Sequence, residues 1–261
     1  LSAVTNIGQP RLQNLTASGG NPALKPFLSE NWDISYEWYF GDASSLTFAY
    51  FNKEVDILIV GKLMGTEVLG IYSLAKQLVY RPFGIISPIL MKIATPFFSK
   101  IQNKSKELKE SYLSLLKMVS SINFAVYLLM FILAEPLVYI LYGADFLEVV
   151  VLVRILSIYM FFIALKNPMG TITIALGRTD LELYWSLATL VVVPAFVYFA
   201  SSFSIEHVAI SLVLAMIILF VPMWFFVIKS TIHVSLKKYL LAHVPNFRLL
   251  FQNLKDLVIN K

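Results

Sequence analysis

Two apolar stretches near the end of the sequence restrict the possible folds of this chain more than any other feature. Residues 183–200 and 208–228 contain no charged side chain. As helices with a rise of about 1.5 Å per residue, both are long enough to cross a hydrocarbon core of about 30 Å. Only 14% of the residues in the whole chain are charged, against about a quarter in soluble domains. The sequence therefore predicts an all-α integral membrane protein.

Apolar segments elsewhere raise the number of predicted membrane helices to six. We expect these helices at residues 39–60, 68–99, 118–134, 146–176, 183–200 and 208–228. Proline removes a backbone donor and bends a helix, so the second helix should be kinked at Pro82, Pro88 and Pro96. The fourth should be kinked at Asn167-Pro168 and capped by Gly177.

Three regions follow from this pattern. Residues 1–37 form a polar cytoplasmic arm or linker, residues 38–230 a six-helix membrane lobe, and residues 231–261 a cytoplasmic amphipathic tail on the membrane surface. Within the lobe we expect residues 100–117 to form a loop that leads into the start of an amphipathic helix, followed by the third membrane helix. Gly61 should end the first helix, and Glu135-Pro136 should break the third.

The basic residues alternate along the predicted loops. The arm, the segment 100–117, the turn at Arg178 and the tail hold nearly all of them, while the intervening loops hold only Lys62. Cytoplasmic loops of membrane proteins carry an excess of Lys and Arg. The pattern therefore predicts a multi-pass protein with both ends in the cytoplasm, and it accounts for the net charge of +5 without nucleic-acid binding.

Basic residues also lie inside the predicted membrane helices. They are Lys76, Arg81, Lys92, Arg154 and Lys166. A charge at the bilayer centre costs about 2.5–3.5 kcal/mol on insertion scales, so such residues face a polar interior, extend to the interface or pair with a carboxylate. Arg81 and Lys92, eleven residues apart, should share a helix face and lie about 16 Å apart, whereas Lys76 is turned about 140° from Arg81.

Two acidic residues lie in the first predicted helix. Glu54 and Asp56 could bind a coupling proton or sodium ion. Asp56 could instead hold Lys53 or Asn52, because Lys53 precedes it by three residues and an ion pair within the helix is as reasonable as contact with a cargo.

Several kinds of chemistry are excluded or unsupported. The chain has no cysteine, so disulfides, thiolate metal sites and cysteine nucleophiles are excluded. The spacing of His207, His233 and His243 forms no metal site, and we expect these residues at the membrane interface. We therefore predict no metal and no cofactor. The predicted outward loops are short and hold no paired Asp-x-Asp, so we also predict no enzymatic activity.

Several short motifs follow one another along the chain. They are Asp56-Ile57-Leu58-Ile59-Val60-Gly61, Gly65, Leu69-Gly70-Ile71-Tyr72, Ala75, Leu78, Pro82, Pro96-Phe97-Phe98-Ser99-Lys100-Ile101-Gln102, Ala134-Glu135-Pro136-Leu137-Val138, Leu141-Tyr142-Gly143 and Ala175-Leu176-Gly177-Arg178. In their order and spacing they resemble the motifs of bacterial polysaccharide flippases, the Wzx-type lipid-linked oligosaccharide transporters of the multidrug/oligosaccharidyl-lipid/polysaccharide exporter superfamily.

This resemblance implies the second six-helix lobe of a two-lobe exporter in the bacterial inner membrane. It implies transport of an undecaprenyl-diphosphate-linked oligosaccharide for O-antigen, capsule or exopolysaccharide synthesis, by alternating access around a cationic cavity. The expected partners are this glycolipid, the bilayer, and the missing N-terminal lobe or polysaccharide assembly proteins. The expected substrate-binding residues are Arg81, Lys92, Arg154, Lys166, Lys76 and Lys53.

Other functions remain open at this point. A cation-coupled multidrug exporter of the same superfamily would have acidic rather than basic cavity residues. A membrane-embedded glycosyltransferase or polymerase would carry acidic metal-binding or general-base residues in a large loop, and the predicted outward loops are short. A third possibility is a shortened protein that only associates with another half-transporter.

Overall fold

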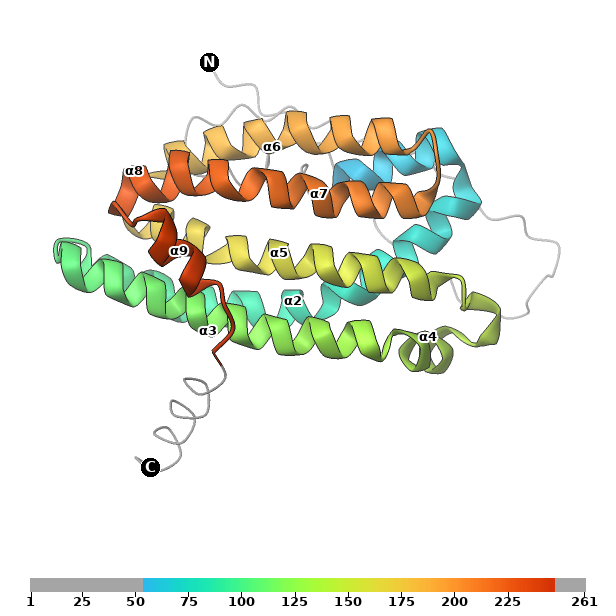
Figure 1. Cartoon of the computed structure of the whole chain (residues 1–261), viewed down its shortest axis with the longest axis horizontal. Helices are drawn as coiled ribbons and strands as arrows, with labels where there is room; N and C mark the ends of the chain where they lie inside the picture. Colours follow the sequence, from blue (N-terminus) through green and yellow to red (C-terminus); the bar gives the residue numbers. More distant parts are fainter. Residues whose placement is uncertain (1–53, 247–261) are drawn as a thin grey trace, which may run out of the picture. The chain divides into compact units, whose positions relative to one another are not determined.

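The described part of the chain, residues 54–246 of a computed structural model, is built from helices (Figure 1). Residues 54–64 are helical. The following elements are α2 (Thr66–Ile101), α3 (Ser105–Ile132), α4 (Ala134–Tyr142), η1 (Ala144–Phe146), α5 (Val149–Ala175), α6 (Thr179–Ala200), α7 (Ile205–Met223), the π-helix η2 (Trp224–Ile228), α8 (Lys229–Ile232) and α9 (Leu236–Ala242).

Within residues 54–246, five helices are long and apolar enough to cross a membrane. They are α2, α3, α5, α6 and the continuous helix Ile205–Ile232. The prediction of an all-α membrane protein is therefore confirmed. The first predicted span, residues 39–60, overlaps the helix at residues 54–64, but most of that span, the predicted arm and the end of the predicted tail lie outside the described residues.

Helix α5 is the centre of the helical lobe. It packs against α2, α3 and α7, while α6 packs mainly on α7 (Figure 1). Val153, Leu156 and Met160 of α5 are buried. Lipid tails are as apolar as these side chains, so close packing and hydrogen bonds must hold the helices together. Two such bonds reach α2, from Asn167 Nδ2 to Ser87 Oγ at 2.5 Å and from Tyr127 of α3 to the Val79 carbonyl at 3.3 Å.

The segment 100–117 is not the predicted loop. Helix α3 begins at Ser105, and only residues 102–104 separate it from α2. Leu108, Tyr112 and Leu116 are buried on one face, at the spacing of an amphipathic helix. Lys104 and Lys106 are exposed and Lys109 and Lys117 are half-buried, and these lysines made the segment appear polar throughout.

The turn between α5 and α6 confirms the predicted cap at Gly177. This residue has φ +66°, the Gly177 N–H donates to the Ile174 carbonyl at 3.1 Å, and the Arg178 N–H donates to the Thr173 carbonyl at 2.8 Å. These are the two hydrogen bonds of a Schellman motif. Helix α6 then begins at Thr179, earlier than the predicted start at residue 183.

Gly61 does not end the first helix, which continues to residue 64. Gly65, with φ +91°, separates it from α2. A Cβ atom at Gly61 would lie 3.0 Å from Leu69 Cδ2. The glycine therefore allows α2 to approach closely, and the helix break falls at the next glycine along the chain.

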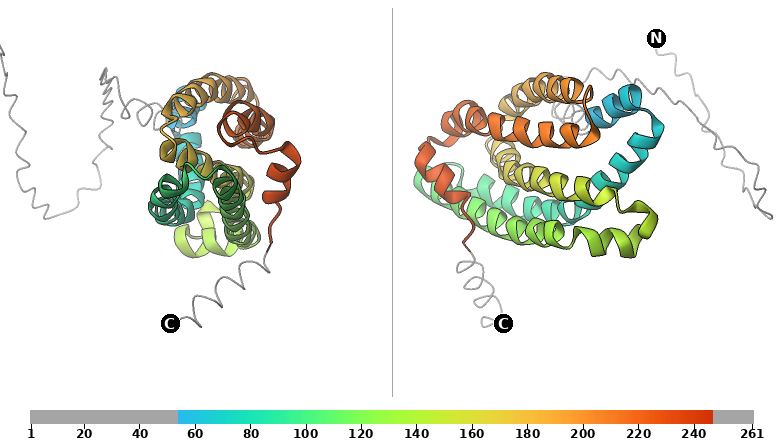
Figure 2. Two further views of the ribbon diagram at one scale, coloured as in Figure 1. Left: turned by 90° about the vertical axis from the view of Figure 1, so that its left-hand side faces the viewer. Right: turned by 45° about the vertical axis from the view of Figure 1, so that its right-hand side comes forward.

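The end of the described chain folds back onto the lobe. The helix that starts at α7 continues through the π-helix and α8, and the chain turns at His233, whose φ is +54°. Helix α9 then crosses α3 (Figure 2). Tyr239 and His243 are buried in this contact, so α9 is more than the surface helix that the sequence predicted.

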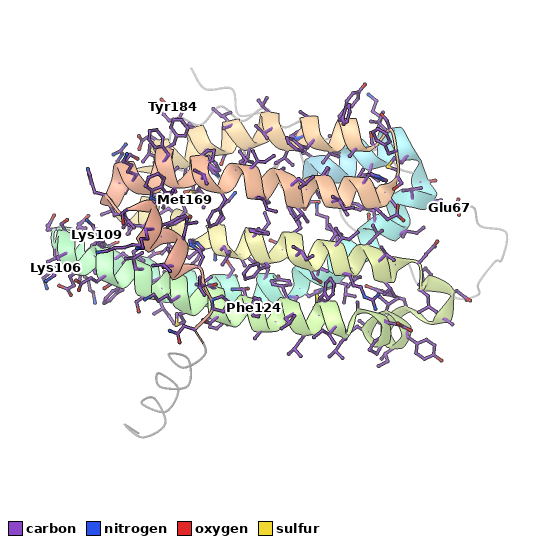
Figure 3. The ribbon with its side chains drawn as sticks, viewed as in Figure 1. Glu67, Lys106, Lys109, Phe124, Met169 and Tyr184 are labelled. Carbon is purple, nitrogen blue, oxygen red and sulfur yellow. The ribbon has the colours of Figure 1, made fainter. Side chains whose placement is uncertain are left out.

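Charges differ between the two ends of the helices. Lys106 and Lys109 lie at the end where α2 meets α3, and Glu67 lies at the opposite end (Figure 3). The first end, with α8 and α9, also carries Lys100, Lys104, Arg178, Lys229, Lys237 and Lys238 against Glu107, Glu110, Asp180 and Glu182. The other end also carries Glu135, Asp145, Glu148 and Glu206 against Lys62.

Candidate cation-lined site

A buried ion pair joins the first described helix to α2. Lys76 Nζ lies 2.7 Å from Asp56 Oδ1, and the Tyr72 hydroxyl donates a hydrogen bond to Oδ2 of the same carboxylate. Asp56 is only 3% exposed and Lys76 only 8%. Tyr72 precedes Lys76 by one helical turn, so both donors reach the carboxylate from the same face of α2.

Lys76 lines a pocket between residues 54–64 and α2. This outer pocket has a volume of about 540 Å³ and is lined by Glu54, Ile57, Ser73, Lys76, Gln77, Tyr80, Arg81, Gly84 and Ile85. It brings Lys76 and Arg81 to one space, although α2 alone would place them about 140° apart. The helix at residues 54–64 supplies the second wall that this arrangement needs.

Lys76 also lines a second space within the lobe. This inner chamber has a volume of about 260 Å³ and is lined by Lys76, Tyr80, Phe83, Tyr159, Met160, Ile163, Lys166, Asn167, Thr189, Val193 and Met216. These residues come from α2, α5, α6 and α7. Lys76 and Tyr80 line both the outer pocket and the inner chamber, so these two side chains lie between the spaces.

Glu182 of α6 provides negative charge near Lys166 without forming a direct ion pair with it. Thr173 Oγ1 donates to Glu182 Oε2 at 3.4 Å. A Cβ atom at Gly170 would lie 3.1 Å from Glu182 Oε1, so the glycine lets the carboxylate rest against α5. The Lys166 ammonium therefore has a neighbouring countercharge but keeps its own hydrogens available.

Two of the predicted substrate-binding residues lie away from Lys76, Arg81 and Lys166. Lys92 is exposed on α2, and Arg154 Nη2 lies 3.8 Å from Glu135 of α4, with both side chains substantially exposed. Neither residue lines the outer pocket or the inner chamber. Lys53 lies outside the described residues.

The predicted ion-coupling residues differ in their surroundings. Glu54 lines the outer pocket, whereas Asp56 binds Lys76 and Tyr72 of the next helix. In the described part of the chain, no group of three or more acidic or histidine side chains could hold a metal ion.

Sequence reasoning missed the roles of Tyr72, Tyr159 and Glu182. Tyr72 could have been found, because it lies one turn from Lys76. Tyr159 could also have been found, because it lies seven residues before Lys166 and therefore on the same face of α5. Glu182 carried no such signal, because its place beside Lys166 depends on how α6 packs after the turn at Gly177.

The fold and site thus define a multi-pass, all-α membrane protein with a basic polar interior. Comparison with known proteins identifies its relatives. The family described as "Polysaccharide biosynthesis protein" matches residues 40–151, which confirms the predicted resemblance to bacterial polysaccharide exporters.

Three of the relatives are named as biosynthesis proteins for amylovoran, teichuronic acid and lipopolysaccharide. The chain is 30% identical over 196 residues to the amylovoran biosynthesis protein AmsL of Erwinia amylovora, covering 75% of this chain and 50% of the relative. It is 28% identical over 198 residues to the teichuronic acid biosynthesis protein TuaB of Bacillus subtilis, covering 76% and 38%. It is 25% identical over 194 residues to the lipopolysaccharide biosynthesis protein WzxC of Escherichia coli, covering 74% and 39%.

The matched segment spans half or less of the length of these relatives. No solved structure matches the chain. A second family, described as the β-barrel of TonB-dependent receptors, matches residues 2–69. Residues 54–64 and 66–69 of that segment are helical, so the described part of the second match is not β-strand.

Proposed function

We propose that this chain is part of a flippase that moves an undecaprenyl-diphosphate-linked oligosaccharide across the bacterial inner membrane. The single observation that carries the proposal is the outer pocket, which the buried Lys76 and the exposed Arg81 both line. The relatives named for amylovoran, teichuronic acid and lipopolysaccharide synthesis support a surface polysaccharide as the product.

The outer pocket suits a diphosphate head group. Its volume of about 540 Å³ falls within the range of about 300–1,000 Å³ that is usual for ligand sites. Guanidinium and ammonium groups form strong charge-assisted hydrogen bonds with phosphate oxygens. In this proposal Arg81 and Lys76 bind the head group, Asp56 positions Lys76, and Glu54 remains the residue for a coupling ion.

The proposed direction follows from the charges at the ends of the helices. The end that carries Lys106, Lys109 and Arg178 would face the cytoplasm, because basic residues are retained on that side. The lobe would then move against a second lobe in alternating access, exposing the pocket first to the cytoplasmic leaflet and then to the outer one.

Two other functions are less well supported. A cation-coupled multidrug exporter of the same superfamily should have mainly acidic residues in its cavity, whereas Asp56 is bound by Lys76 and Tyr72 and Glu54 lines the outer pocket together with Lys76 and Arg81. A glycosyltransferase or polymerase needs general-base or metal-binding carboxylates, and the described residues form no metal-binding group.

Deletion of the gene in its own host tests the proposal. A flippase defect should leave completed lipid-linked repeat units on the cytoplasmic leaflet and remove the surface polymer. Absence of the lipid-linked units themselves, or their accumulation in unpolymerised form on the outer leaflet, would instead indicate an enzyme and would refute transport.

A chromosomal Arg81→Gln change then tests the pocket. We expect export to fall at least tenfold at unchanged protein abundance, because this change removes one charged contact to phosphate. Arg154→Gln is the matched control, since Arg154 pairs with Glu135 outside the pocket. Equal export by the Arg81 variant and the control would contradict the assignment of the outer pocket.

A further inference from the structure

The inner chamber contains two polar groups that no protein atom satisfies. Within residues 54–246, the Lys166 ammonium and the Tyr159 hydroxyl have no hydrogen-bond partner, although both residues line this space. Polar groups inside proteins are normally paired, and those that are not bind water or a ligand. These groups are therefore available to an occupant of the chamber.

The two groups share one face of α5. They are seven residues apart, which on an ideal helix leaves them within about 20° of each other and about 10 Å apart along the axis. Each can donate a hydrogen bond, and only the ammonium is charged. An occupant that satisfies both needs an oxygen acceptor at each end, and a negative charge at the Lys166 end gives the stronger hydrogen bond.

The remaining lining favours a flat, partly apolar ligand. Tyr80, Phe83 and Tyr159 contribute aromatic side chains. The volume of about 260 Å³ is below the usual range for a whole drug-sized ligand. The chamber is therefore suited to one unit of a larger molecule.

The side of the inner chamber that adjoins the outer pocket carries an ion pair with no net charge. Lys76 is bound to Asp56 at 2.7 Å, so this pair is neutral as a whole. Lys166 is then the basic group of the chamber whose ammonium is not in an ion pair, with Glu182 as the nearest opposing charge. Selection for a negative charge in the chamber would depend mainly on Lys166.

We propose that the inner chamber binds a single acidic sugar unit, with the sugar carboxylate on Lys166 and a sugar hydroxyl on Tyr159. The outer pocket would bind the diphosphate, and the inner chamber would bind the sugar next to it. This inference rests on the proposed function only for the choice of a sugar as the ligand.

Calorimetric titration of the full chain in lipid nanodiscs tests this assignment with free monosaccharides and inorganic phosphate. We expect glucuronate to bind at least tenfold more tightly than glucose or phosphate. Lys166→Gln should reduce glucuronate affinity about tenfold, because a charge-assisted hydrogen bond is lost. Tyr159→Phe, which keeps the ring, should weaken both sugars about threefold or more.

Lys106→Gln is the matched control, since Lys106 is exposed at the end of α3 (Figure 3). The proposal is overturned if Lys166→Gln binds glucuronate as well as this control does. It is also overturned if, in an Arg81→Gln background that weakens phosphate binding at the outer pocket, phosphate or glucose binds as tightly as glucuronate, because the chamber would then recognise charge alone or no charge. Export assays are independent of this titration, so normal export after deletion of the gene, together with intact glucuronate binding, would refute only the flippase proposal.

Discussion

The carboxylate of Asp56 and the ammonium of Lys76 lie 2.7 Å apart in the interior of the lobe. Burial removes both groups from water, so each depends on the other for compensation. Breaking a buried pair by removing one partner costs about 3–5 kcal/mol, whereas removing both is much less harmful.

Asp56→Asn should therefore lower the free energy of unfolding in detergent by about 3–5 kcal/mol, because Lys76 loses its countercharge. Asp56→Asn combined with Lys76→Met should recover most of this loss. The exposed pair of Lys104 and Glu107, with 3.0 Å between Nζ and Oε2, is the control, and Glu107→Gln should cost less than about 1 kcal/mol. Equal losses in the single and double variants would show that the pair is not the source of stability.

Asn167 of α5 and Ser87 of α2 form a hydrogen bond between two helices that both contain proline. Asn167→Leu should destabilise the protein by about 1–3 kcal/mol, because the buried Ser87 hydroxyl loses its donor. Adding Ser87→Ala should restore part of the stability by removing the unsatisfied group. Denaturant unfolding in micelles measures both changes, and no difference between them would argue against this bond.

Tyr239 fixes α9 through its ring and not through its hydroxyl. The ring packs 5.4 Å from Phe220 and 4.4 Å from His243, measured between centroids. The hydroxyl is buried and has no hydrogen-bond partner in the described part of the chain. Tyr239→Phe should be neutral or stabilising by about 1 kcal/mol, whereas Tyr239→Ala should cost about 3–5 kcal/mol. A substantial loss in the phenylalanine variant would reveal a partner for the hydroxyl.

His243 should make the docking of α9 sensitive to acid. Burial lowers the pKa of His243 from 6.5 to about 4, so the folded state binds fewer protons than the undocked one. The stabilisation is complete above pH 6.5 and is lost as the pH falls towards 4, by about 3 kcal/mol in total. Hydrogen exchange of residues 236–242 should therefore accelerate over this interval.

His243→Gln is the control for this titration. The variant has no imidazole, so its exchange rates should not show the additional acceleration between pH 6.5 and 4. If the wild-type protein and the variant respond identically to acid, another group must be responsible. The measurement is local to α9 and does not require the transport activity.

The class of fold could be predicted because the length of an apolar segment is visible in the sequence without knowing which other segments pack against it. Residues 183–200 and 208–228 needed no knowledge of their neighbours to be recognised as spans. The cap at Gly177 was also predictable, since a glycine after a long apolar segment is typical of a Schellman motif. The start of α3 was missed because the lysines at residues 104, 106 and 109 concealed the buried face formed by Leu108 and Tyr112.

The site was only partly predictable from the sequence. The identity of the embedded charges was evident, but which of them share a space depends on helix packing. Lys76, Arg81 and Lys166 line the two adjoining spaces, whereas Arg154 pairs with Glu135 near the start of α5. The partner of Asp56 lies twenty residues away on the next helix, a distance that local spacing rules do not cover.

The return of the chain across α3 has a practical consequence for anyone who shortens or tags this protein. Ser120 Oγ donates to the His243 carbonyl at 2.5 Å, and the Asn246 N–H donates to Ser121 Oγ at 2.7 Å. A stop codon placed directly after the last long helix would remove both attachments and leave the aromatic ring of Phe220 uncovered. Purification handles and reporter fusions should therefore be joined downstream of residue 246, where they leave these hydrogen bonds to α3 intact.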